Sequence, residues 1–149
     1  MDFVFASLIF VLLLGFTAAT YSNYADLYTK NENKRSLEAS ALSISEILVK
    51  SPGYPENWEL NASGARVIGL AKSENALDPL KVSAFDSLTY NDTRALLGIA
   101  NDFYISIKTA DGQMQMSKGT EQENASSVSI ERAVYYNRSY CRLKVRIYE

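Results

Sequence analysis

The sequence contains no histidine, and this absence excludes several kinds of chemistry. Without imidazole there is no His general base, no Ser-His or Cys-His nucleophile pair, no haem ligation by His and little scope for zinc. The only cysteine, Cys141, matches no metal-binding spacing, so we expect a small apolar residue in a strand. There is also no nucleophile elbow, phosphate-binding loop or convincing carboxylate pair. We therefore predict that the protein is not an enzyme and uses no cofactor or metal.

An excess of charge of one sign is missing as well. The 149 residues include 15 basic and 17 acidic side chains, which are mixed along the chain and leave a net charge of −2. This pattern gives no basic footprint for nucleic acid and no acidic tail, so we predict no nucleic-acid partner. The chain is long enough for one domain with an appendage.

Residues 3–25 carry no charge at all, and three interpretations compete for this stretch. A secretory signal peptide would need a positive start and an apolar core of about 7–15 residues, whereas the only early charge is Asp2 and the apolar run is longer. A membrane anchor needs about 20 apolar residues, and Phe3 to Tyr21 supplies nearly that number. Tyr21, Tyr24 and Tyr28 would then lie in an interfacial aromatic belt.

A third interpretation follows from the absence of proline before Pro52. Leu37, Ala41, Ile44 and Leu48 recur at helical spacing on one face, so a single helix is predicted from about Asp2 to Lys50, roughly 70 Å long. It would end at the stop signal Ser51-Pro52-Gly53. Its first half is apolar all round and must be buried on every side, whereas the second half needs cover on one side only.

The residues after Gly53 predict a head rich in β-structure. We expect Trp58 to anchor a turn-rich loop, a strand over 65–71, a helix over 80–88 capped by Asp78, and a second helix over 94–97 capped within 91–93. Alternating residues from Phe103 onwards predict antiparallel strands joined at 111–112 and 137–138, with one apolar and one solvated face.

The predicted fold is thus α+β, with three regions. Residues 1–25 form a protruding apolar helix, 26–52 continue it as an amphipathic helix, and 53–149 form the head. The stripe of Leu37, Ala41, Ile44 and Leu48 would cover the apolar face of an antiparallel sheet of four or five strands.

Segments along the whole chain resemble the archaeal type IV pilin-like proteins of the euryarchaeal type. Asp2-Phe3 before the apolar helix is similar to the mature end of the class III signal, where Gln-x-Ser-x-acidic-Phe leads the apolar segment. The resemblance continues through SPGYPENW, GLAKSENALD, RALLGI, DFYISI, ERAVYYN and LKVRIY. The Gln-x-Ser part and a basic leader do not occur in this sequence, which leaves the cleavage site of a prepilin peptidase open.

This resemblance implies a type IV pilin-like fold and a structural subunit of an extracellular filament, with surface adhesion as its role. The helix would reside in the membrane, meet the prepilin peptidase and the pilus assembly machinery, and then polymerise with copies of itself. The residues expected to form the filament core are Asp2, Phe3, Phe5, Leu8, Ile9, Leu12, Leu13 and Phe16. Asp2 could pair with a neighbouring terminal amine, as the family's acidic residue does, or simply suit the positive helix end. The alternatives are a minor pilin or a single-pass surface protein that does not polymerise.

Four Asn-x-Ser/Thr sequons begin at Asn61, Asn91, Asn124 and Asn137. Ten asparagines in a sequence of this composition would give one or two such sequons by chance. All four are predicted to lie in loops of the head, where N-glycans on an extracellular surface would be tolerated.

Overall fold

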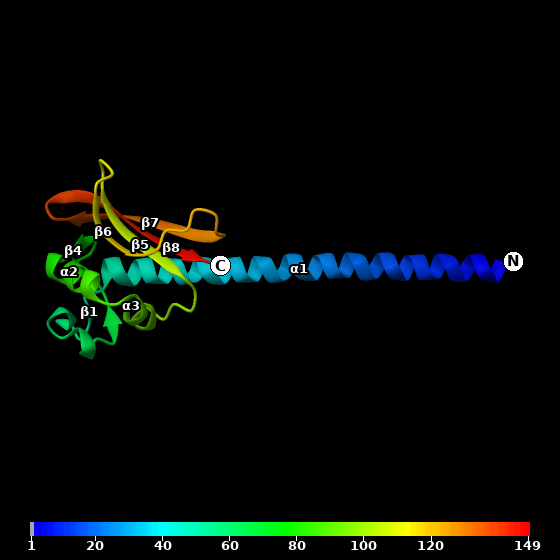
Figure 1. Cartoon of the computed structure of the whole chain (residues 1–149), viewed down its shortest axis with the longest axis horizontal. Coiled ribbons are helices and arrows are strands. Elements are labelled where there is room, and N and C mark those ends of the chain that lie inside the picture. The colour runs from blue at the N-terminus through cyan, green and yellow to red at the C-terminus, as the bar shows by residue number, and fades with distance from the viewer. Residues whose placement is uncertain (1) are drawn as a thin grey trace. The chain divides into compact units, whose positions relative to one another are not determined.

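The computed structural model describes residues 2–149, except for the side chains of residues 2, 23, 25 and 26. Its first element is the helix α1 (Asp2–Lys50), with the bounds expected from the absence of proline before Pro52 (Figure 1). The chain divides into two compact units, Met1–Ser36 and Leu37–Glu149. The first consists of helix alone among its described residues, and the second contains the rest of α1 and every strand.

The unit Leu37–Glu149 is built around a six-stranded sheet with the order β3-β4-β7-β8-β5-β6. Its strands are β3 (Ala71–Ser73), β4 (Ala76–Leu77), β5 (Phe103–Thr109), β6 (Met114–Gly119), β7 (Ser127–Tyr136) and β8 (Ser139–Tyr148). The remaining elements are β1 (Gly53–Tyr54) paired with β2 (Val67–Ile68), the short 3₁₀ helices η1 (Trp58–Leu60) and η2 (Ala62–Gly64), α2 (Pro79–Ser87) and α3 (Tyr90–Leu96).

The predicted α+β class agrees with this structure, but the predicted sheet was too small and too regular. Six strands are present instead of four or five, and the sheet is mixed because β4 pairs in parallel with β7 at Ala76 and Tyr135. The expected single strand over 65–71 is split into β2 and the start of β3. Strands of two or three residues carry too few side chains to produce an alternating pattern, which explains why the sequence did not reveal them.

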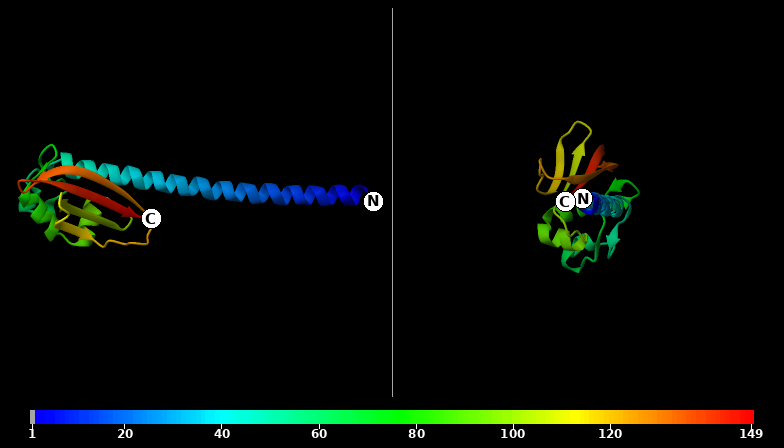
Figure 2. Two further views of the ribbon diagram at one scale, coloured as in Figure 1. Left: turned by 90° about the horizontal axis from the view of Figure 1, so that it is seen from above. Right: turned by 90° about the vertical axis from the view of Figure 1, so that its right-hand side faces the viewer.

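The end of α1 packs into the core of this unit. Ala41, Ile44 and Leu48 are buried, and Leu37 is half-buried against the same cluster as the inward residues of the sheet. Figure 2 shows the last turns of α1 between the sheet and the region of α2 and α3. The single charged side chain among the inward positions of β7, Arg132, donates a hydrogen bond from Nε to Ser45 Oγ at 3.3 Å, while that buried hydroxyl donates to the Leu42 carbonyl at 2.8 Å.

Local capping explains the two short helices. The carboxylate of Asp78 accepts a hydrogen bond from the backbone N–H of Leu80, and Pro79 occupies the first helical position, as the sequence predicts. For α3 the predicted cap within 91–93 was wrong, because the helix starts earlier. Thr89 is the cap: its hydroxyl accepts from the Asp92 N–H at 3.1 Å and donates to the Asp92 carboxylate at 2.7 Å.

Hydrogen bonds from buried side chains hold the loop between α1 and the sheet in place. Trp58 is fully buried, and its indole N–H donates to the carbonyl of Gly69 at 2.9 Å. A side chain at Gly69 would place its Cβ 2.1 Å from the Ser51 carbonyl oxygen, so only glycine allows this close approach. The ammonium of Lys81 donates to the carbonyls of Pro52 and Glu56, which fixes the same loop against α2.

The two faces of the sheet differ less than the alternating sequence predicts. β5 lies between β8 and β6, and its outward residues Tyr104 and Ser106 are buried along with its inward ones. In the register these two lie beside Arg146 and Lys144, whose side chains are only 21% and 25% exposed. The aliphatic stems of these long residues can cover the sheet while their charges stay near water. The prediction of a solvated face was therefore wrong along β5.

Candidate functional site

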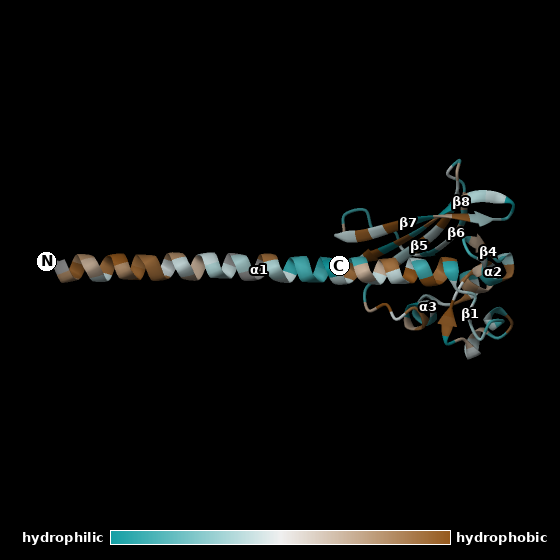
Figure 3. Ribbon diagram, turned by 180° about the vertical axis from the view of Figure 1, so that it is seen from behind, coloured by the Kyte–Doolittle hydropathy of each residue, from teal (hydrophilic) through white to brown (hydrophobic). Residues whose placement is uncertain are grey.

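The described part of the chain has one large surface that its own fold leaves uncovered, the apolar segment Phe3–Tyr21 of α1. All its large apolar side chains up to Phe16 are exposed, by 53% to 85%. They include the predicted filament-core residues Phe3, Phe5, Leu8, Ile9, Leu12, Leu13 and Phe16. Figure 3 shows the apolar colour on successive turns of the first part of α1 and polar colours further along. Asp2, the remaining predicted residue, has a side chain outside the described residues.

The polar side chains in this segment are compatible with an apolar environment. The hydroxyls of Ser7 and Thr17 donate to the carbonyls of Val4 and Leu14, each at 2.9 Å. The Thr20 hydroxyl lies 3.0 Å from the Phe16 carbonyl and 2.9 Å from that of Thr17. Since a hydroxyl without a partner is costly to bury, these internal bonds allow the segment to be surrounded by lipid or by other helices.

The length and composition of α1 would also allow it to cross a membrane. A signal sequence near an N-terminus meets the same criterion, so this finding alone is weak evidence for membrane insertion. A Cβ added at Gly15 would meet no atom from elsewhere in the chain within 4 Å, which leaves room for a close neighbour at that turn. Tyr21, Tyr24 and Tyr28 are exposed by 64% to 78% just beyond the segment.

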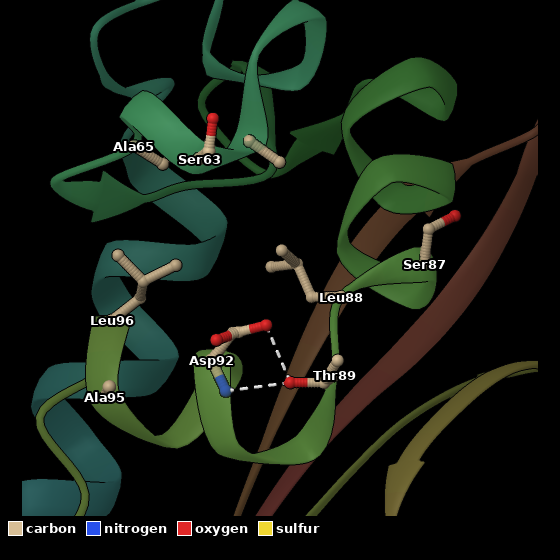
Figure 4. A pocket seen from close by; sticks show the side chains of 9 residues that line it. Ser63, Ala65, Ser87, Leu88, Thr89, Asp92, Ala95 and Leu96 are labelled. Atoms are coloured by element: carbon tan, nitrogen blue, oxygen red, sulfur yellow. Dashed lines mark hydrogen bonds between the residues drawn. The ribbon is translucent and has the colours of Figure 1, made fainter.

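A groove of about 510 Å³ lies in the unit Leu37–Glu149, between η2 and the two short helices (Figure 4). Ala62, Ala65, Ala95, Leu88 and Leu96 supply its apolar lining. Its polar side chains all make hydrogen bonds within the chain: Ser63 with Asn61, Ser87 with the Ser83 carbonyl, and Thr89 with Asp92. No nucleophile–base pair faces this groove among the described residues.

The sequons differ from one another in structure. Asn61, Asn124 and Asn137 lie outside regular helices and strands of the sheet and are exposed, whereas Asn91 lies within α3. The prediction that all four occupy loops was therefore wrong for Asn91, because α3 begins at Tyr90. The hydroxyl residue of that sequon, Thr93, is fully buried and donates to the Thr89 carbonyl.

The titratable groups reveal no reactive centre in the part of the chain that the structure describes. Burial raises the pKa of the Cys141 thiol, which favours the protonated and unreactive form. The pKa of Tyr136 is also raised, mainly by burial. Among residues 2–149, apart from the four undescribed side chains, no group of His, Cys, Asp and Glu is arranged to hold a metal ion.

Sequence reasoning missed two features of the surface and core. Val49 and Ser45 extend the buried face of α1, and the helical period from Ala41 would have identified Val49. The exposed Tyr135 and Tyr140 form an edge-to-face pair, with ring centroids 5.6 Å apart, at the end of the β7–β8 hairpin. Their juxtaposition depends on the strand register, which only the two-residue turn could have suggested.

Comparisons with known proteins identify no relative. No protein-family model matches the chain, and neither a curated protein nor a solved structure is significantly similar to it. The fold and the apolar segment define the class to which the protein can be assigned: an α+β protein with a long N-terminal helix that is able to enter an apolar environment.

Proposed function

We propose that the protein is a structural subunit of an extracellular type IV pilus-like filament and that it polymerises through its apolar segment. The observation that carries this proposal is the all-round exposure of apolar side chains from Phe3 to Phe16 on a helix whose own chain does not cover them. Such a helix requires an apolar surrounding on every side. Lipid supplies it before assembly, and the same segments of neighbouring copies supply it afterwards.

The second unit supports this proposal by having a core of its own. Its inward sheet residues and the end of α1 form one buried cluster, so it can fold without contributions from the apolar segment. Surface adhesion is the role we propose for the filament, and N-glycans on exposed sequons would lie on this unit. The segments that resemble archaeal pilin-like proteins, from Asp2-Phe3 to LKVRIY, support the same interpretation.

Two related functions use the same helix differently. A single-pass surface protein would leave the apolar segment in lipid permanently, and a minor pilin would start or tip a filament formed by another subunit. Lipid tails and other apolar helices are equally apolar surroundings for Phe3–Tyr21. The segment alone therefore does not distinguish the filament subunit from these alternatives. Abundance of the chain in filaments sheared from cells separates them directly.

The test is a charge placed in the middle of the apolar segment. We expect Leu12→Lys to abolish filaments, because an ammonium at the centre of a helix bundle costs several kcal/mol without a partner. The matched control is Asn33→Lys, which adds the same charge to an exposed position of the same helix outside the apolar segment. Filaments are counted by negative-stain electron microscopy of the sheared fraction.

Two further measurements complete the test. A chain of residues 26–149, which contains the whole unit Leu37–Glu149, should be monomeric in detergent-free buffer and should unfold cooperatively. Filaments of normal number from Leu12→Lys would overturn the proposal. A wild-type chain that is found only in membranes, and never in the sheared fraction, would favour the single-pass surface protein.

A further inference from the structure

The end of the β7–β8 hairpin presents an aromatic and basic surface. Tyr135 and Tyr140 are cross-strand partners, 45% and 77% exposed. Arg138 occupies the turn with a φ of 66°, and Arg142 lies on the same face of β8 as Tyr140, directly opposite Lys108 of β5. We call these five residues the hairpin surface. Tyrosine and arginine are the residue types that are enriched in the centres of protein interfaces.

The positive charge of the hairpin surface is only partly neutralised. Glu131 lies 4.0 Å from Arg142 and 3.9 Å from Lys144, so that one carboxylate is shared between two cations. Asp111 lies in the nearby β5–β6 turn. The segment 103–149 as a whole carries seven basic and five acidic side chains, whereas 53–102 carries seven acidic and four basic ones. The two parts of this unit therefore have opposite net charges.

A second surface has the complementary composition. Tyr54, Leu60 and Leu80 are 61%, 81% and 68% exposed, and they come from the end of β1, the end of η1 and the first turn of α2. Glu56 is exposed, and Asp78 precedes α2. We call these five residues the loop–helix surface. It combines exposed apolar side chains with acidic ones, whereas the hairpin surface combines exposed aromatic side chains with basic ones.

A hydrogen bond joins the two segments of the loop–helix surface, and among the described residues neither Glu56 nor Asp78 forms a salt bridge, although the Asp78 carboxylate accepts the Leu80 N–H. The Lys81 ammonium joins the two segments because it donates to the Glu56 carbonyl at 2.7 Å from within α2. That ammonium is itself buried, and Glu59, whose side chain is 12% exposed, lies 4.0 Å from it. The positive charge of Lys81 is therefore directed inward, and the outward charges of this surface are carboxylates.

The two surfaces are different parts of the unit Leu37–Glu149, and they come nearest to each other where β4 pairs with β7 at Tyr135 and Ala76, the latter two residues before Asp78. Figure 1 shows the end of the β7–β8 hairpin on one side of α2 and the loop around β1 on the other, and the end-on view in Figure 2 agrees. A contact between two different surfaces is heterologous, so each copy can receive one neighbour and offer its other surface to the next. Such a contact continues indefinitely unless its rotation closes a ring.

We infer that the hairpin surface of one copy docks on the loop–helix surface of the next, so that the heads form a second line of contact along the filament. Tyr135 and Tyr140 would cover the exposed Leu60 and Leu80, and Arg142 would lie near Glu56. This inference rests on the proposed function for its setting, since a filament brings the heads close together. The partner is a second copy because the complementary surface is found on this chain itself, in composition and in charge.

A pair of cysteines tests the inference in full-length filaments. In a Cys141→Ala background, the double variant Tyr140→Cys, Leu60→Cys should give a ladder of disulfide-linked multimers after mild oxidation. Each single-cysteine variant should give at most dimers, because one thiol per copy cannot extend a chain. The matched control pairs Leu60→Cys with Met114→Cys, an exposed residue of β6 that lies outside the hairpin surface, and should give no ladder.

Charge reversal provides a second test without cross-linking. Arg142→Glu and Glu56→Arg should each lower the number of filaments by about tenfold, since opposed like charges replace a complementary pair. The double variant should restore filaments toward the wild-type number. Arg142 and Glu131 are 4.0 Å apart and about half exposed, so loss of this pair should hardly affect folding.

The outcomes separate the inference from the proposed function. Filaments that form normally but give no ladder from the Tyr140–Leu60 cysteine pair, and no rescue by the double charge reversal, would overturn the inference and leave the filament proposal intact. A wild-type chain that forms no filaments would overturn both. A ladder together with rescue would establish that the two surfaces meet.

Discussion

The two ends of α1 use apolar residues in opposite ways. Between Phe3 and Phe16 the large apolar side chains point in all directions and are all exposed, whereas Ala41, Ile44 and Leu48 lie on one face and are buried in the core of their own unit. The backbone is helical in both stretches. The difference therefore lies in the distribution of apolar side chains around the axis, which determines whether a helix is covered by its own chain or needs another surrounding.

This comparison indicates which residues should matter for folding and which for assembly. A side chain that is buried within its unit contributes to the free energy of unfolding of that unit. An exposed apolar side chain contributes nothing there, and its effect can appear only when lipid or another copy covers it. Leucine occurs in both stretches, so substitutions of the same type can compare them directly.

The largest difference in the free energy of unfolding should appear when one leucine in each stretch is replaced by alanine. Leu48→Ala should lower the free energy of unfolding of the unit Leu37–Glu149 by about 2–5 kcal/mol, because it leaves a cavity at a fully buried position. Leu12→Ala should change it by less than about 0.5 kcal/mol. The fluorescence of Trp58, the only tryptophan and fully buried, reports unfolding of this unit during denaturation in mild detergent.

A third leucine controls for position on the helix. Leu42 lies near Leu48 but is 45% exposed, so Leu42→Ala should cost much less than Leu48→Ala. If Leu12→Ala lowered the free energy of unfolding as strongly as Leu48→Ala does, the apolar segment would belong to the core of the folded chain. The comparison between the two stretches would then be wrong.

The sequence was sufficient to predict the long helix and the main strands because each has a long periodic signal. The alternation of Leu143, Val145 and Ile147 matches the inward face of β8, and Asn137-Arg138 forms the tight turn before it with positive φ at both residues. Such patterns repeat over several turns or several pairs, so local sequence is enough to specify them.

The short elements could not be predicted in the same way because long-range contacts define them. β4 has two residues and pairs with β7, almost 60 residues further along the chain, through Ala76 and Tyr135. The start of α3 depends on Thr89, which caps the helix. The sequence Asn91-Asp92-Thr93 that follows contains residue types that are equally suited to a cap. The residues of the apolar segment were predictable from composition, whereas no contact among the described residues covers their large apolar side chains.

The sequons provide a further difference between the apolar segment and the unit Leu37–Glu149, since all four lie in that unit, beyond α1. Under the proposed extracellular function, Asn61 should carry a glycan in protein from the native cell, because both Asn61 and Ser63 are exposed and their side chains hydrogen-bond at 2.7 Å. Asn91 should remain unmodified when the glycan is transferred after folding, because Thr93 is buried and its hydroxyl donates a hydrogen bond to the Thr89 carbonyl.

Site-resolved mass spectrometry of the purified protein measures both occupancies. The variant Ser63→Ala should lose the glycan at Asn61 and leave the other sites as they were, since it removes only the hydroxyl that the sequon requires. Full occupancy at Asn91 together with an unmodified Asn61 would contradict the structural distinction between the two sites.

The smallest effect that we expect is a dependence of stability on alkaline pH within the unit Leu37–Glu149. Burial raises the pKa of Tyr90 above the ordinary value of about 10, and its hydrogen bond to the Asp102 carboxylate acts in the same direction. The folded state therefore favours the neutral phenol. The resulting stabilisation is fully present below pH 10 and is lost as the pH rises through the raised pKa of the folded state.

Tyr90→Phe isolates this contribution because it keeps the ring that stacks on Phe103 at 4.7 Å and removes only the hydroxyl. At neutral pH the variant should be less stable by about 1 kcal/mol, since the hydroxyl no longer donates to Asp102 or accepts from the Phe103 N–H. Between pH 10 and 12 the difference from wild type should shrink, while the raised pKa of Tyr136 contributes equally to both proteins. Denaturation at several pH values, followed by Trp58 fluorescence, measures this difference. A difference that stays constant or grows with pH would mean that Tyr90 ionises at least as readily in the folded chain as in the unfolded one.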